Sequence, residues 1–146
     1  MKNWIKILGV LFVLGVVGIF ATYKFVYNKP HPKYDELEAD FKIRASQLYN
    51  DFVADPVASP QKYNGKMLEI QGILTEIESA DSSTIAYFVL EEGMFGHQGV
   101  RIAMLPEYAD KITADLKDKE LKIKGLCAGF NDTDVILEHG SLVGGQ

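Results

Sequence analysis

The chain has 146 residues, which is enough for one ordinary domain with a hydrophobic core and too few for two. It contains 15 Lys and Arg residues, 20 Asp and Glu residues and one Cys, with a formal net charge of −5. A single Cys excludes a disulfide framework and a Cys-rich zinc site. Residues 1–29 hold four lysines and no acid, so residues 30–146 hold the other 11 basic groups and all 20 acids and carry −9.

The first predicted element is an apolar helix over residues 7–23. These 17 residues carry no charge, and most are Leu, Ile, Val, Phe or Gly. As a helix the run is about 25 Å long, slightly shorter than the roughly 30 Å hydrocarbon layer of a bilayer. Both ends are flanked by an aromatic ring and a lysine, which prefer the membrane interface: Trp4, Lys6, Tyr23 and Lys24. We therefore expect residues 1–29 to be an uncleaved, single-pass signal-anchor.

Two other interpretations of this apolar segment are weaker. A cleaved signal peptide needs small residues before its cleavage site, and the best candidate, Ile19-Phe20-Ala21, fits poorly. A lipoprotein signal needs a Cys directly after the apolar run, and none follows it. A short basic stub ahead of a first hydrophobic segment usually stays in the cytoplasm. We therefore expect the soluble domain on the extracytoplasmic (periplasmic) side of a bacterial membrane.

Residues 30–64 are predicted to form a linker and a helical extension. Pro30 and Pro32 cannot continue the apolar helix, so the segment around them is a linker. After it, apolar residues recur at helical spacing from about residue 37 to residue 52, which predicts a helix over residues 37–52.

A second short helix is predicted over residues 56–63. Asp55 is a favourable N-cap, and Pro56 suits the first helical position. The Asn64-Gly65 pair is then expected to make the turn into a β region.

Residues 65–146 are predicted to form five strands, with a helix after the third strand. The strands are expected over residues 67–77, 84–90, 100–105, 120–128 and 134–139, and the helix over residues 106–116. In the first strand the inward phase slips by one residue at Gly72, which indicates a β-bulge that bends the strand. This β-β-β-α-β-β order predicts a mainly β protein with a five-stranded OB-fold barrel. A short SH3-like barrel and a generic α+β roll are the alternatives.

Three blocks of the chain carry a resemblance to a known family. They are Ala45-x-x-Leu48-x-x-x-Phe52; Ala58…Lys62-Tyr63-Asn64-Gly65-Lys66 with Leu68-Glu69-Ile70-x-Gly72; and Ile123-Lys124-Gly125-x-Cys127-x-Gly129 with Asp134-Val135-x-Leu137. Over residues 34–143 the chain resembles the tRNA-anticodon-like OB-fold family of small bacterial proteins, which often carry an N-terminal membrane or lipoprotein anchor. The resemblance implies an OB fold with an N-terminal helical extension. The matching positions are glycines at bends and apolar strand residues, so they carry over no functional residue.

Nucleic-acid binding is the first function that an OB fold suggests. It needs a basic groove with aromatic platforms on the second and third strands. The candidate side chains are Tyr87, Phe88, Arg101 and Phe130, with Lys122 and Lys124 as further cations. A domain of charge −9 repels a polyanion, because phosphate contacts dominate the affinity. Nucleic-acid binding is therefore disfavoured, and export across the membrane would disfavour it further.

Residues 91–99 are predicted to form a Gly-rich loop that presents Met94 and Phe95. Three glycines beside two large apolar side chains indicate a mobile loop that contacts a peptide or an envelope protein. The favoured interpretation, however, is an ordinary hairpin loop that folds Phe95 back over the end of the barrel.

Metal binding and catalysis find little support in the sequence. His97 and His139 lack the spacing that metal chemistry requires. Cys127 falls on the inward phase of its strand, where an inert buried thiol is expected. We therefore expect no metal, no cofactor and no catalysis. The chain is interpreted as a membrane-anchored OB-fold binding or interaction module of the bacterial envelope, and the alternative is an oligosaccharide- or single-stranded nucleic-acid-binding OB-fold protein.

Overall fold

The computed structural model describes residues 2–24, 33–80, 83–94 and 96–144. The chain divides into two compact units, Met1–Pro32 and Lys33–Gln146. The first unit contains the helix α1 (Lys2–Thr22), so the predicted helix is confirmed. Its segment Asn3–Thr22 has a mean hydropathy of 2.4 and is long and apolar enough to cross a membrane, although a signal sequence has the same properties. The predicted linker around Pro30 lies outside the described residues.

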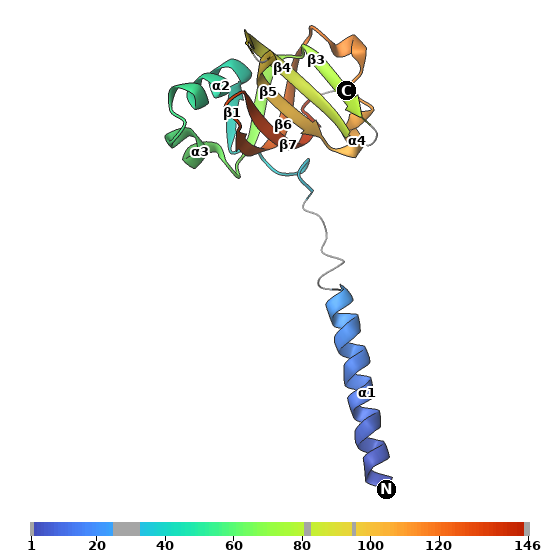
Figure 1. Cartoon of the computed structure of the whole chain (residues 1–146). Helices are drawn as coiled ribbons and strands as arrows, with labels where there is room; N and C mark the ends of the chain where they lie inside the picture. Colours follow the sequence, from blue (N-terminus) through green and yellow to red (C-terminus); the bar gives the residue numbers. More distant parts are fainter. Residues whose placement is uncertain (1, 25–32, 81–82, 95, 145–146) are drawn as a thin grey trace. The chain divides into compact units, whose positions relative to one another are not determined.

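The second unit is mainly β, as predicted (Figure 1). In chain order its elements are β1 (Phe41–Arg44), α2 (Ala45–Ala54), α3 (Ala58–Tyr63), β2 (Met67–Ile73), β3 (Glu76–Ala80), β4 (Ser83–Gly93), β5 (Gly96–Met104), α4 (Pro106–Ala109), the 3₁₀ turn η2 (Ala114–Leu116), β6 (Glu120–Phe130) and β7 (Asp134–Leu142). Within the described residues the strands form one open seven-stranded sheet in the order β1-β2-β6-β7-β5-β4-β3, and this order does not by itself confirm the predicted five-stranded barrel. The pairs β1–β2 and β5–β7 are parallel, and the other pairs are antiparallel.

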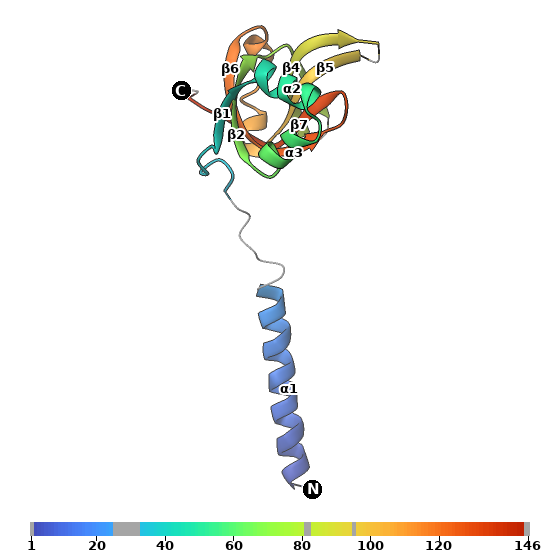
Figure 2. The ribbon, with the colours of Figure 1, turned by 90° about the vertical axis from the view of Figure 1, so that its left-hand side faces the viewer.

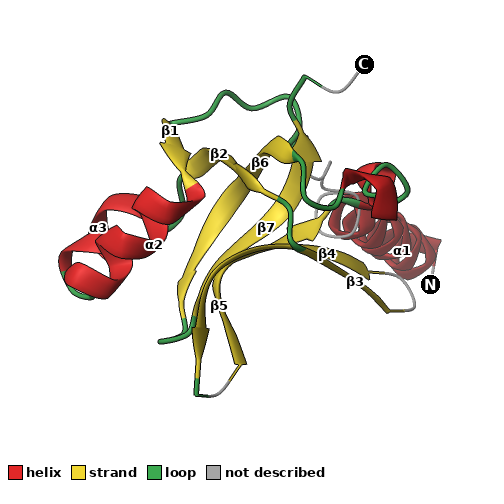
Figure 3. Cartoon of the chain, turned by 90° about the horizontal axis from the view of Figure 1, so that it is seen from above, coloured by secondary structure: helices red, strands yellow, loops and turns green. Residues whose placement is uncertain are grey.

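The strand predicted over residues 67–77 is in fact two strands. β2 pairs with β6 without a register shift, so the predicted bulge at Gly72 is wrong. The change comes two residues later, where the Leu74 N–H donates to the Lys119 carbonyl (3.0 Å) and the Thr75 N–H donates to a carbonyl of β4 (2.9 Å). The chain thus leaves the neighbourhood of β6 and joins β4 within two residues. This change of neighbouring strand accompanies the strong curl of the sheet (Figure 3).

The helix predicted over residues 37–52 begins only at Ala45. Before it, the Asp40 N–H donates to the Met67 carbonyl (2.7 Å), and the Met67 N–H donates to the Asp40 carboxylate (2.8 Å). These bonds lead into β1, in which every second residue is half-buried, so pairing with β2 outweighs the helical spacing. α2 and α3 then lie together on one side of the curled sheet (Figure 3). The buried face of α2 enters the core through Ala45, Leu48, Tyr49 and Phe52.

The other two predicted helices are shorter than expected. α3 begins at Ala58, so its N-cap is Val57 and not the predicted Asp55; the Asp55 Oδ1 still accepts the N–H groups of Val57 (3.1 Å) and Ala58 (2.8 Å). The helix predicted over residues 106–116 is α4 followed by the separate turn η2. Its apolar residue Ile112 is nevertheless buried in the core.

The loop predicted over residues 91–99 is instead part of a long hairpin. β4 and β5 continue past a register shift near Leu90, and they pair as far as Gly93 and Gly96. In Figure 2 this hairpin extends beyond the rest of the sheet. The last two predicted strands are confirmed as β6 and β7, each a few residues longer than expected.

Candidate binding face

The outward side of β3, β4, β5 and β7 carries most of the polar contacts between side chains of the sheet. Neighbouring strands place Glu76 opposite Tyr87 and Tyr87 opposite Arg101, so these three side chains point to the same side. The residues of the other phase, such as Ala86 and Ile102, are buried in the core. We call this surface the acidic face; its members are Glu76, Glu78, Tyr87, His97, Arg101 and Asp134.

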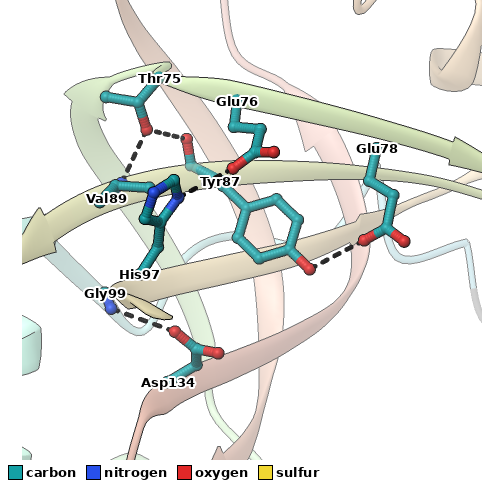
Figure 4. A network of polar contacts seen from close by, with 8 residues as sticks. All are labelled: Thr75, Glu76, Glu78, Tyr87, Val89, His97, Gly99 and Asp134. Atoms are coloured by element: carbon teal, nitrogen blue, oxygen red, sulfur yellow. Dashed lines mark hydrogen bonds and ion pairs between the residues drawn. The ribbon is translucent and has the colours of Figure 1, made fainter. Parts of the chain in front are cut away.

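Tyr87 lies at the centre of the acidic face. Its hydroxyl donates to Glu78 Oε2 (3.0 Å), and the Arg101 guanidinium carbon lies 5.6 Å from the ring centroid (Figure 4 shows the Glu78 bond). Burial and the bond to Glu78 raise the pKa of Tyr87, and the charge of Arg101 opposes them only in part. The phenol therefore stays protonated at neutral pH and acts as a donor to a carboxylate.

A shallow hollow lies beside Tyr87, where β3, β4 and β5 meet. His97 Nδ1 and Glu76 Oε2 are 3.1 Å apart, and both side chains are about half exposed. Thr75 fixes the start of β3, because its hydroxyl donates to the Tyr87 carbonyl (2.9 Å) and accepts the Val89 N–H (2.8 Å; Figure 4). The hollow has a volume of about 340 Å³ and is lined by Thr75, Glu76, Val89, Glu92, His97 and Lys117.

Asp134 joins the acidic face through the backbone of β5. The Gly99 N–H donates to Asp134 Oδ1 (3.1 Å; Figure 4). A Cβ on Gly99 would lie 2.1 Å from the Phe88 carbonyl oxygen, so only glycine fits at this position. The same part of β5 is tied to α2, because the Tyr49 hydroxyl donates to Gln98 Oε1 (2.9 Å). Burial raises the pKa of Tyr49, and nearby carboxylates add to the shift.

Two of the predicted site residues meet on this face, and a third, Met94, lies at the tip of the β4–β5 hairpin. Tyr87 and Arg101 are paired across β4 and β5, as described above. Met94 is 96% exposed at the tip of the hairpin. Phe95, the other residue predicted to present an apolar contact there, lies outside the described residues.

The two predicted phenylalanine platforms contribute to packing. Phe88 is 1% exposed and belongs to the core, so its ring is not available at the surface. Phe130 is half-buried, with its ring centroid 5.7 Å from that of Phe52 and 6.3 Å from that of Tyr49. The interior thus takes up Phe88, whereas Phe130 stays half-buried beside α2.

The lysines proposed as phosphate contacts lie away from Tyr87. Lys122 and Lys124 are on β6, which β7 separates from β5. Lys124 Nζ donates to the backbone carbonyls of Asp35 (2.8 Å) and Leu37 (2.5 Å). Of the three predicted cations, Arg101 alone therefore lies beside the Tyr87 ring.

Sequence reasoning missed the residues that surround Tyr87, namely Glu76, Glu78, His97 and Asp134. Glu76 and Glu78 could have been found from the sequence, because they alternate with the apolar residues of the predicted first strand. The contribution of His97 and Asp134 depends on strand register, which the sequence does not reveal.

Among the described residues, no group of three or more His, Cys, Asp and Glu side chains could hold a metal ion. Burial raises the pKa of Cys127 to about 11, so its thiol is protonated at neutral pH.

The second unit is a curled, mainly antiparallel sheet with a polar outward face, an arrangement also found in OB folds. A family model described as tRNA_anti-like matches residues 1–141, so the chain belongs to this family. A search of curated proteins finds no match. One similar solved structure is described as a "putative nucleic acid-binding lipoprotein" from Klebsiella pneumoniae subsp. pneumoniae. It has a TM-score of 0.48 and 13% sequence identity, over 79% of this chain and 99% of that chain. A likeness this distant transfers no residue's role.

Proposed function

We propose that the chain is a membrane-tethered OB-type binding module without catalytic activity. Its acidic face binds an extended, positively charged segment of another envelope protein. In this proposal α1 crosses the membrane as an uncleaved anchor, and the second unit lies on the extracytoplasmic side. The proposal draws on the membership of an OB-like family and on the length and hydropathy of α1.

The charged side chains around Tyr87 determine which kind of partner we propose. Three carboxylates, those of Glu76, Glu78 and Asp134, share the acidic face with a single arginine. Such a face attracts lysine and arginine side chains and repels phosphates. Arg101 already lies over the Tyr87 ring, which leaves less of the ring for stacking on a base or a sugar. A cationic polypeptide is therefore favoured over a nucleic acid or an oligosaccharide.

We further infer that the curled sheet corresponds to an OB barrel. In this interpretation β2 and β3 are two halves of the first barrel strand, and β4 to β7 are the other four strands. The bonds of Leu74 beside β6 and of Thr75 to β4 support it, because they pair consecutive residues with different neighbours. The parallel β5–β7 pair supports it as well. β1 is then an addition from the N-terminal extension.

The test uses the full chain in nanodiscs of phosphatidylcholine, a lipid without net charge. A fluorescent decapeptide of alternating Lys and Thr is titrated, and a 12-nucleotide single-stranded DNA serves as the competing probe. The Glu76→Gln/Glu78→Gln variant should raise the Kd of the peptide about three- to tenfold, because two surface charge contacts are lost. The matched control is Glu107→Gln/Asp110→Asn, which removes two exposed carboxylates on and beside α4 and should leave the Kd unchanged.

Two results would refute the proposed partner. One is an equal loss of peptide affinity in both double variants, because this would reflect net charge and not the acidic face. The other is DNA binding that is tighter than peptide binding and weakens steeply with salt.

A further inference from the structure

A second charged surface lies on the outward side of β1, β2 and β6. Strand register places Arg44 opposite Gln71 and Gln71 opposite Lys122, so these three side chains form one row across the sheet. The inner phase of the same strands is apolar, and Ile70 and Ile123 are completely buried. The row therefore points to solvent.

A parallel row lies two residues further along the strands. It consists of Lys42, Glu69 and Lys124, again one residue from each strand. Strands are about 4.8 Å apart and rise about 3.3 Å per residue, so the two rows fit within roughly 10 by 7 Å between Cα atoms. We call this surface the basic face; its cations are Lys42, Arg44, Lys122 and Lys124.

The strands of the basic face carry more cations than acids. Their acids are Glu69, which pairs with Lys42 (3.6 Å), and Glu120, which lies opposite Ile73 at the end of β2. The adjoining segment 33–40 adds four acids: Glu36 pairs with Lys33, the Asp40 carboxylate accepts the Met67 N–H, and Asp35 and Glu38 are the other two. In the part of the chain that the structure describes, Arg44 and Lys122 are exposed and make no ion pair. Two cations are thus free to bind an anion.

The N-terminal end of the second unit lies beside the basic face. Lys124 holds the carbonyls of Asp35 and Leu37, and the Tyr34 ring stacks on His139 of β7 with centroids 3.9 Å apart. The first residues after the connection to α1 are therefore fixed next to β6 and β7. The eight connecting residues, 25–32, span at most about 30 Å even when fully extended.

We propose that the basic face lies against the anionic headgroups of the bilayer in which the chain is anchored. This inference rests on the membrane tether of the proposed function. A free domain of charge −9 would be repelled by an anionic surface, but a short tether prevents it from leaving. The electrostatic field of the lipid surface decays over about 8 Å at physiological salt. Within this distance it selects the orientation of the domain. The basic face turns toward the lipid, and the acidic face, which lies on β3, β4, β5 and β7, stays accessible to a partner.

Lysine labelling of the full chain in nanodiscs tests this orientation. Acetylation by a water-soluble succinimidyl ester, followed by mass spectrometry, gives the rate at Lys122 relative to Lys111, an exposed lysine after α4. This ratio should fall at least threefold when phosphatidylcholine is replaced by a mixture with 30% phosphatidylglycerol, and it should recover in 0.5 M NaCl. Arg44→Gln should weaken the protection of Lys122. Lys117→Gln, which also removes one exposed cation, should not.

The outcomes separate this inference from the proposed function. If alkaline carbonate extracts the chain from the bilayer, the tether is absent and both fail. If the chain resists extraction and the labelling ratio is the same in both lipids, only the orientation is refuted. Protection of Lys122 by the 12-nucleotide DNA in phosphatidylcholine nanodiscs would also refute it, because the basic face would then bind nucleic acid.

Discussion

Gly72 is a point of close approach between α2 and the sheet, and enlarging it tests how the two are packed. A Cβ at Gly72 would lie 3.0 Å from the Cβ of Ala45 and 3.3 Å from Cγ of Phe88. Both neighbours are only 1% exposed, and β2 is held by β1 on one side and β6 on the other. Neither side can yield freely, so Gly72→Ala should lower the free energy of unfolding by about 1–3 kcal/mol.

A second substitution makes the prediction specific. Ala45→Gly removes the atom that the new Cβ would meet, at a cost of about 1–2 kcal/mol in helix propensity and lost burial. The double variant should therefore be more stable than the sum of the two changes predicts, by at least about 0.5 kcal/mol. Ala54→Gly, at the exposed end of α2, is the matched control and should be additive with Gly72→Ala.

The assay is urea unfolding of the full chain in detergent micelles, followed by tyrosine fluorescence. Additive behaviour of Gly72→Ala and Ala45→Gly would refute the reasoning, because it would mean that the two residues are not in contact. An equal coupling with Ala54→Gly would also refute it, since the effect would then come from the helix as a whole.

Three further predictions concern other contacts. Tyr49→Phe, which removes the bond to Gln98, should cost about 1 kcal/mol and speed amide exchange in the β4–β5 hairpin; unchanged exchange would contradict the tie to α2. Asp55→Ala should cost about 1 kcal/mol in urea unfolding, because the bonds from the Val57 and Ala58 N–H groups at the start of α3 are lost, and Asp55→Asn should restore most of it. Because burial raises the pKa of Cys127 to about 11, only about one thiol in a thousand is ionised at pH 8. Iodoacetamide should therefore modify Cys127 in urea and not in the native chain, and rapid native labelling would be evidence against its burial.

The later strands could be predicted because their signal is local. Period-two alternation over residues 120–128 and 134–139 reports which side chains point inward, whatever the neighbouring strand is. β1 has only four residues, and its apolar spacing continues into α2, so the helical interpretation included it. Only its pairing with β2 makes it a strand.

The site could be predicted in part. Residues 84–90 are apolar on both faces, so the sequence nominated Tyr87 and Phe88 together although they point to opposite sides. The structure buries Phe88 and leaves Tyr87 outward, next to Arg101. Which of two apolar phases faces the core depends on the surrounding elements, here α2 and the inner phases of the other strands. That information is not contained in one strand.

The sheet order also explains how a chain of one net sign carries two surfaces of opposite sign. Alternate residues of a strand point to the same side, so a strand with like charges two positions apart presents a stripe of that sign. β3 presents Glu76 and Glu78, and β6 presents Lys122 and Lys124. β3 pairs with β4, whereas β6 pairs with β2 and β7, so the two stripes lie on strands that are not paired with each other. The value of −9 is therefore only the net charge of the domain. The kind of partner that it binds depends on which of the two stripes lies beside Tyr87.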